Sequence, residues 1–206
     1  MSLVAKAGEK RVIKPIANGN YTAVCYGVVD LGTQYNEQYD KAQDKVVIMW
    51  DLIDETIEID GEEVPRTLTK TYTRSLHERS QLRKDLKSWR GREFTDDELR
   101  GFKLTNIIGV PCLVQVSTTE TANGTYTNID AVASLPKGME KPKSQLARIV
   151  FDSEDFDREE YDALPKWMQE RLMKAEGFKD RLAAASAGVI EPIDDFPGED
   201  DEDLPF

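Results

Sequence analysis

The hydrophobic pattern changes its period twice along residues 20–140, and this order of patterns constrains the fold more than any other feature. Three runs are rich in β-branched and aromatic residues or alternate as strands do, namely residues 20–30, 45–59 and 66–76. A turn at Asp60-Gly61 joins the second run to the third. We therefore predict a meander of three strands, with a polar loop after the first.

A helical pattern follows these strands. Residues 77–90 carry an apolar stripe that ends before Gly91, and Ser75 and Glu78 have the spacing of a capping box. The stripe consists of Leu82, Leu86 and Trp89. We predict a helix over this segment and a short second helix at residues 95–101, which have the same start and stop signals.

Two further strands are predicted at residues 110–120 and 125–136, joined by a turn at Asn123-Gly124. Three strands, a helical insertion and two strands are the order of a five-stranded OB-type barrel with its helix between strands 3 and 4. A sandwich with a similar number of strands is the alternative. The predicted fold class is mainly β with added helices.

The region after the predicted barrel carries one more apolar stripe, which predicts a C-terminal helix ending at Gly177. This stripe consists of Leu164, Trp167, Met168, Leu172 and Ala175. Because such a face has to be buried, we expect the helix to pack on the barrel or on another subunit. The predicted organisation has four parts: an N-terminal arm (1–19), the barrel (20–140), a helical extension (141–180) and a disordered acidic interaction tail (181–206).

Charge is spread unevenly along the chain. Residues 1–150 hold 21 basic and 21 acidic residues, whereas residues 151–206 hold 6 and 18, so the net charge of −12 comes from the last quarter. Residues 66–92 carry nine basic residues against two acidic ones, a local net charge of +7. This segment predicts a cationic surface on an acidic protein.

The residues that commonly carry enzyme chemistry form no recognisable motif. His77 is the single histidine, no phosphate-binding glycine motif occurs, and Cys25 and Cys112 stand alone in apolar runs. We expect buried thiols in a reducing compartment, no metal or other cofactor, and a binding protein rather than an enzyme. No apolar run approaches 18 residues and no signal peptide is evident, so we expect a cytoplasmic protein without membrane contact.

Residues that suit single-stranded nucleic acid occur together in the predicted barrel. Such binding needs cations for the phosphates and flat rings on which bases stack. Lys70, Tyr72 and Arg74 would share one face of the third strand. The remaining candidates are loop tyrosines and the polar face of the first helix, namely Tyr35, Tyr39, Arg79, Arg83, Lys87 and Arg90. The alternative is that this helix face is charged only because it is exposed. Trp50 shares a face with Val46, Ile48 and Leu52 and is expected in the core.

The chain ends in "DDEDLPF", an acidic run followed by two large apolar side chains. A terminal Phe can anchor in an apolar pocket of a partner protein while its carboxylate pairs with a basic residue there. The acidic residues can steer the tail to a pocket with a basic rim. This tip resembles the C-terminal tip of bacterial single-stranded DNA-binding proteins, although Leu204 stands where isoleucine is usual. The resemblance implies recruitment of replication and recombination proteins through Asp200, Asp201, Glu202, Asp203, Leu204, Pro205 and Phe206.

A longer segment is similar to bacteriophage-encoded single-stranded DNA-binding proteins with an OB core. The similarity covers most of residues 20–175 and rests on "YTRSLHERSQLRKDLKSWRGREFTDDELRGFKLTNIIGVPCLVQV", followed by a hairpin and "LPKG". It implies single-strand binding without sequence preference in phage replication or recombination, in the host cytoplasm. The alternative is a non-catalytic adaptor whose barrel binds protein. The oligomeric state, including a homo-oligomer, stays open.

Overall fold

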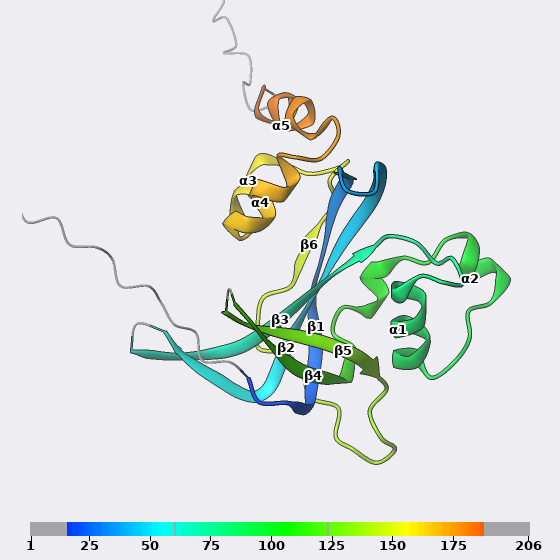
Figure 1. Cartoon of the computed structure of the whole chain (residues 1–206), viewed down its shortest axis with the longest axis vertical. Helices are drawn as coiled ribbons and strands as arrows, with labels where there is room; N and C mark the ends of the chain where they lie inside the picture. The colour runs from blue at the N-terminus through cyan, green and yellow to red at the C-terminus, as the bar shows by residue number, and fades with distance from the viewer. Residues whose placement is uncertain (1–15, 60, 123, 188–206) are drawn as a thin grey trace, which may run out of the picture.

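The computed structural model describes residues 16–59, 61–122 and 124–187 (Figure 1). Its sheet has six strands: β1 (Gly19–Asn36), β2 (Lys41–Ile59), β3 (Glu62–Thr73), β4 (Pro111–Thr121), β5 (Gly124–Ala133) and β6 (Ile149–Phe151). The helices are α1 (Gln81–Arg90), α2 (Asp96–Arg100), the 3-10 turn η1 (Leu104–Ile107), α3 (Arg158–Ala163), α4 (Lys166–Leu172) and α5 (Phe178–Ala187).

The first five strands form a nearly closed antiparallel barrel in the order β3-β2-β1-β4-β5. β1 pairs with β4 along residues 19–24 and with β2 along residues 23–36, so the strands form one continuous, curved sheet. A sandwich would have two separate sheets packed face to face. α1 spans the gap between the end strands, because it contacts β3 through Asp85 and the end of β5 through Ser88. The predicted OB-type barrel with a helix between β3 and β4 is confirmed.

Two local predictions need correction. The first helix begins at Gln81, because Ser80 caps it by accepting a hydrogen bond from the backbone of Arg83 at 3.1 Å. Ser75 instead belongs to the turn before it, where its carbonyl accepts the Ser80 hydroxyl at 2.6 Å. The predicted loop after the first strand is also wrong, since β1 and β2 continue as a long hairpin through residues 31–44. The second helix has the expected capping box, formed by Thr95 and Glu98.

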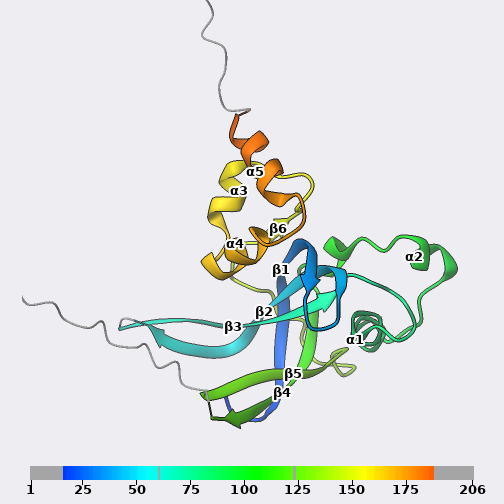
Figure 2. The ribbon, with the colours of Figure 1, turned by 45° about the horizontal axis from the view of Figure 1, so that its top comes forward.

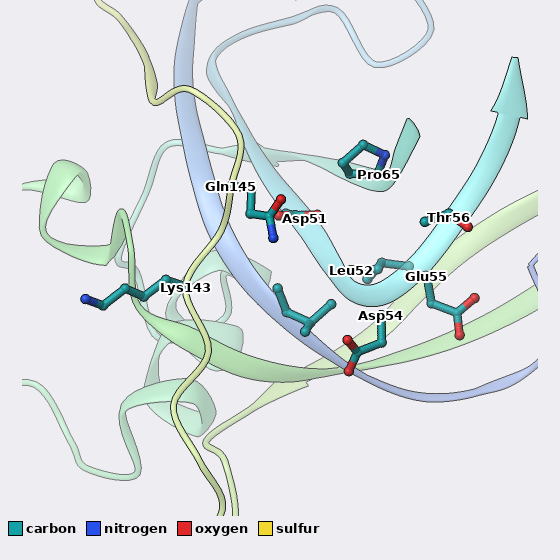
Figure 3. A pocket seen from close by; sticks show the side chains of 9 residues that line it. Asp51, Leu52, Asp54, Glu55, Thr56, Pro65, Lys143 and Gln145 are labelled. Carbon is teal, nitrogen blue, oxygen red and sulfur yellow. The ribbon is translucent and has the colours of Figure 1, made fainter. Parts of the chain in front are cut away.

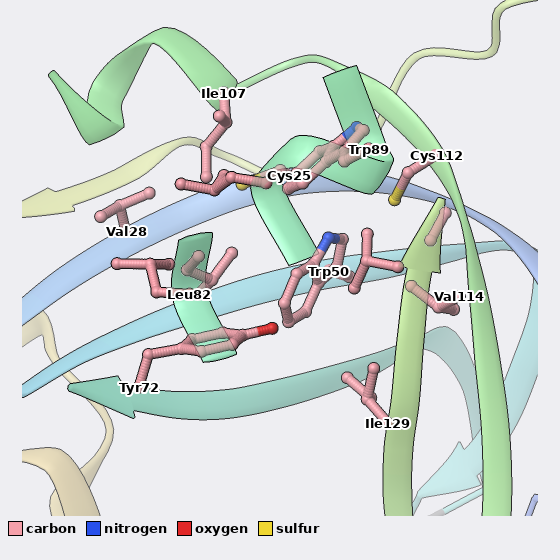
Figure 4. Close-up of a cluster of buried hydrophobic side chains, with 14 of the residues drawn as sticks. Cys25, Val28, Trp50, Tyr72, Leu82, Trp89, Ile107, Cys112, Val114 and Ile129 are labelled. Atoms are coloured by element: carbon pink, nitrogen blue, oxygen red, sulfur yellow. The ribbon is translucent and has the colours of Figure 1, made fainter. Parts of the chain in front are cut away.

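The interior of the barrel is filled by side chains from the strands and from α1 (Figure 4). Trp50 is fully buried, as predicted, and its ring centroid lies 6.0 Å from that of Trp89. Cys25 and Cys112 are free thiols in this core. Burial raises the pKa of the Cys25 thiol to about 12, so it stays protonated and poorly nucleophilic at neutral pH. The prediction of two buried, unpaired thiols is confirmed.

A second core lies on the opposite face of β1 and β2. Apolar side chains there, including Val29, Val47 and Met49, are covered by the segment from β6 to α5. Met168, Leu172 and Phe178 of this extension are fully buried. In both ribbon views α3, α4 and α5 gather on one side of the sheet, apart from α1 and α2 (Figures 1 and 2). The apolar stripe of the extension therefore packs on its own barrel, except for Trp167, which is 40 % exposed.

The extension differs from the single helix that its stripe predicts. Pro165 separates α3 from α4, and Gly177, with a φ of +65°, separates α4 from α5. α5 continues to Ala187, so the helical extension reaches past the predicted boundary at residue 180.

Candidate nucleic-acid interface

Tyr72 does not lie on an exposed face of β3, so its predicted role as a stacking residue is wrong. The ring is 3 % exposed and points into the barrel among Trp50 and Leu82 (Figure 4). Its hydroxyl donates to Asp85 Oδ2 at 2.7 Å, and burial raises its pKa far above the usual value. As predicted, Leu68 and Tyr72 share one face of β3 and the threonines share the other. However, the face of Leu68 and Tyr72 is turned to the interior of the barrel, and the threonines are turned away from it.

Lys70 shares this inner face and is also a wrong prediction. Its ammonium lies 2.9 Å from Asp85 Oδ2 and 5.1 Å from the centre of the Tyr72 ring. Asp85 Oδ1 accepts a further hydrogen bond from Gln81 at 2.7 Å. We name Lys70, Tyr72, Gln81 and Asp85 the Asp85 network. It attaches α1 to β3, so the charge of Lys70 is compensated within the fold.

The cationic segment carries less free charge than its sequence suggests. At least five of its nine basic residues make ion pairs with other described residues, namely Lys70 with Asp85, Arg74 with Asp30 and Asp44, Lys87 with Glu93, and Arg90 and Arg92 with Glu98. Most of these acids come from outside residues 66–92. The local charge of +7 therefore overstates the potential that a phosphate backbone would meet.

Arg90 is the third corrected residue. Its guanidinium lies between the rings of Phe94 and Phe102, with Cζ 4.4 and 4.9 Å from their centroids, and pairs with Glu98. Hydrogen bonds from Arg92, the Thr95 backbone and Arg90 lower the pKa of Glu98 to about 2. Arg90 thus links α1 to α2, and its charge is compensated by Glu98 within the fold.

The other predicted cations lie nearer to solvent. Arg79 is exposed, and the Lys87 side chain is 53 % exposed beside Glu93. Arg83 is half-buried and donates to the Leu76 carbonyl at 3.2 Å. Arg74 is 39 % exposed, with its guanidinium 3.6 Å from Asp30 and from Asp44. Their predicted contacts with nucleic acid stay predictions.

Tyr35 and Tyr39 project from the end of the β1–β2 hairpin and are 60 % and 66 % exposed. The turn between them is held by its own hydrogen bonds, because the Asn36 side chain accepts the backbone N–H of Tyr39 at 3.3 Å. The Tyr35 hydroxyl donates to Asp40, which raises the pKa of Tyr35. Both rings are therefore available for stacking.

Tyr126 is a candidate that the sequence reasoning missed. It lies on β5 opposite Thr119, near the end of the β4–β5 hairpin, and is 51 % exposed. OB domains bind oligonucleotides with the face of strands 2 and 3 and with the loops that join strands 1 to 2 and strands 4 to 5. Tyr126 follows closely after the predicted turn at Asn123-Gly124, and this position in the sequence indicates an exposed tyrosine near the end of a hairpin.

A separate pocket of about 230 Å³ lies where β2 is irregular (Figure 3). Its lining includes Asp51, Asp54 and Glu55, and the pairing of β2 with β3 shifts between Leu52 and Thr56. Because acidic walls repel phosphate, this pocket does not extend the interface. Within residues 16–59, 61–122 and 124–187, no group of three or more His, Cys, Asp or Glu side chains is arranged to hold a metal ion.

The predicted partner-binding residues Asp200, Asp201, Glu202, Asp203, Leu204, Pro205 and Phe206 lie outside the described residues. None of the described helices has the length and apolar character needed to cross a membrane. Neither a protein-family model nor a curated protein matches this sequence.

Proposed function

We propose that this protein binds single-stranded DNA without sequence preference. The observation that carries the proposal is the presence of three exposed tyrosines, Tyr35, Tyr39 and Tyr126, near the ends of the β1–β2 and β4–β5 hairpins of an OB-type barrel. These are the two connections that OB domains use for oligonucleotides. Stacking on a ring tolerates any base, because every base has a π-face.

Exposed cations supply the complementary part of such an interface. Arg79, Lys84 and Lys87 lie exposed on α1 or just before it. They could track phosphates while the tyrosines hold bases, the combination that binds single strands. The similarity to phage proteins supports a role in phage replication or recombination, in the host cytoplasm, with no catalytic step.

The proposal is tested by fluorescence polarisation with labelled oligo-dT and its duplex at about 50 and 200 mM salt. We expect the single strand to bind more tightly than the duplex, and affinity to fall steeply with salt because counterions are released. Replacing both Tyr35 and Tyr39 with alanine should cost about 1–3 kcal/mol for each base that was stacked.

The matched control is the variant with phenylalanine at both positions, which keeps the rings and loses the hydroxyls. It should bind nearly as the native chain does. Equal affinity for duplex would contradict single-strand binding, and the absence of any oligonucleotide binding would favour the adaptor.

The acidic tail has a separate proposed role, the recruitment of replication and recombination proteins through residues 200–206. Its similarity to the tip of bacterial single-stranded DNA-binding proteins supports this role. The eight acids of residues 191–206 can also compete with DNA for the exposed cations of the barrel.

Deleting residues 191–206 should therefore tighten DNA binding at low salt, by about three- to tenfold, and the gain should disappear as salt screens the tail. The measurement is the dissociation constant of the same oligo-dT for the full and the shortened chain. Replacing Phe206 with alanine leaves all eight acids in place and should leave the affinity unchanged. Identical affinities of full and shortened chains at low salt would exclude competition by the tail.

A further inference from the structure

Two cations from distant parts of the sequence lie on the outer face of the barrel. Lys45 of β2 donates to Thr73 of β3, and Arg171 of α4 donates to Thr71. These two threonines lie two residues apart on one face of β3, so they bring the two cations to the same part of the surface. The pKa of Lys45 is lowered by burial first and by Arg171 second. Within the described part of the chain, neither forms an ion pair with a carboxylate. By contrast, Lys87 and Arg90 of α1 each pair with a glutamate.

The strand register shows why these side chains share a face. Lys45 pairs with Thr73 and Val47 pairs with Thr71 in the β2–β3 ladder. Val47 is buried beneath the helical extension, so the neighbouring positions Lys45, Thr71 and Thr73 face the same side. Arg171 reaches that side from α4, next to the buried Leu172.

Hydrogen bonds hold both cations in place. The Lys45 ammonium donates to Gln43 Oε1 and to Thr73 Oγ1, both at 2.8 Å. Arg171 Nη1 lies 3.5 Å from Thr71 Oγ1. The end of α4 is fixed against the β1–β2 hairpin, because the Gln34 side chain donates to the Arg171 carbonyl at 3.0 Å.

Such an arrangement suits an anion. Two like charges held together without a counterion destabilise each other, and a bound phosphate would remove that repulsion. A guanidinium, an ammonium and threonine hydroxyls are the usual ligands of a phosphodiester. Perturbed ionisation beside a specific charged neighbour is also typical of functional sites.

Trp167 adds a flat ring beside these ligands. It lies one turn before Arg171 on α4, with its ring centre 6.0 Å from the guanidinium carbon. Of the three tryptophans, all among the described residues, Trp50 and Trp89 are buried and Trp167 is 40 % exposed. Phosphate ligands next to an exposed ring fit a nucleotide chain better than a free inorganic anion.

We propose that the helical extension forms a second part of the single-strand interface, in which Lys45, Arg171 and the Thr71 hydroxyl bind a phosphate of the strand and Trp167 stacks on a neighbouring base. This inference rests on the proposed single-strand binding and assigns one of its sites to α4.

The test compares the native chain with a Lys45→Ala/Arg171→Ala variant in oligo-dT binding over a series of salt concentrations. Loss of one phosphate contact should weaken binding about tenfold at low salt and reduce the salt slope by about 0.7. Arg171 is exposed and Lys45 half-buried, so the fold should persist, which circular dichroism checks. The matched control is Arg158→Ala, since Arg158 is an exposed arginine of the same extension that contacts Asp162 and Ser186.

Tryptophan fluorescence gives an independent readout. Oligo-dT should quench the emission of the native chain, and a Trp167→Phe variant should lose most of the quenching because the remaining tryptophans are buried. A double variant with the affinity and salt slope of Arg158→Ala would overturn the inference while leaving single-strand binding intact. If instead inorganic phosphate quenches Trp167 and oligo-dT does not, the site binds small anions and the inference fails. No oligonucleotide binding by the native chain would refute the proposed function itself.

Discussion

Replacing Phe178 with alanine is expected to lower the free energy of unfolding by about 3–5 kcal/mol, the usual cost of removing a buried aromatic ring. Phe178 is 0 % exposed at the start of α5. Its ring centroid lies 5.1 Å from that of Phe156 and 5.7 Å from that of Tyr161. Phe151 of β6 lies 6.4 Å from the same ring, so removal of the Phe178 ring leaves a cavity among aromatic side chains of β6 and α3.

Urea denaturation followed by circular dichroism measures the effect. The control is Lys179→Ala, which changes the next residue on the exposed side of α5 and should stay within about 0.5 kcal/mol of the native chain. A Phe178 variant as stable as this control would show that the extension contributes little to the folded state. Because α4 carries Arg171 and Trp167, the Phe178 variant should also lose DNA affinity near its own melting range.

Replacing Asp85 with alanine should cost about 2–4 kcal/mol of stability. The change leaves the buried Tyr72 hydroxyl without its acceptor and the Lys70 ammonium, whose side chain is 21 % exposed, without its counter-charge. Partial exposure of Lys70 places the expected cost below that of a fully buried ion pair. Thermal and urea unfolding measure it.

An Asp97→Ala variant is the matched control for Asp85. Asp97 also accepts from a cation, Arg100 at 2.6 Å, but its side chain is 89 % exposed, so its loss should cost less than about 1 kcal/mol. A further variant that combines Asp85→Leu, Lys70→Met and Tyr72→Phe removes the polar groups together and should recover part of the stability. If Asp85→Ala were no more costly than Asp97→Ala, the Asp85 network would not be what attaches α1 to β3.

The hydrophobic periodicity of the sequence was sufficient to predict the barrel. The spacing of Leu82, Leu86 and Trp89 defines a helix face, and this face is buried in the barrel as expected. The alternation around Trp50 likewise identified its inner side. These predictions succeed because apolar residues on one face leave only one side that can be buried.

The same reasoning failed for Tyr72 and Tyr126, which stand at the centres of two Thr-Tyr-Thr segments. Tyr72 and Tyr126 have the same immediate neighbours, yet one is 3 % and the other 51 % exposed. Alternation shows which residues share a face, but it does not show whether that part of the strand lies over the core. Tyr126 stands near the end of a hairpin where β5 has exposed residues on both faces, whereas Tyr72 lies beneath α1.

Charge was the least predictable property. A count over residues 66–92 cannot include Asp30, Asp44, Glu93 or Glu98, which lie outside that window and neutralise its cations. For the same reason, no local pattern could bring Lys45 to Arg171, because their proximity depends on how the extension packs on β2. Surface charge depends on the tertiary structure, so a count of charges over a short stretch of sequence gives only the largest net charge that its surface can have.

The burial of β1 on both faces affects how the protein would hold a ligand. Ten consecutive residues of this strand, 23–32, are buried, because one face serves the barrel core and the other serves the helical extension. Tyr35 lies near the end of this strand, and the neighbouring Gln34 also holds the end of α4 by its hydrogen bond to the Arg171 carbonyl. In the proposed complex the protein surface is preorganised, so the entropic cost of association falls mainly on the flexible nucleic acid.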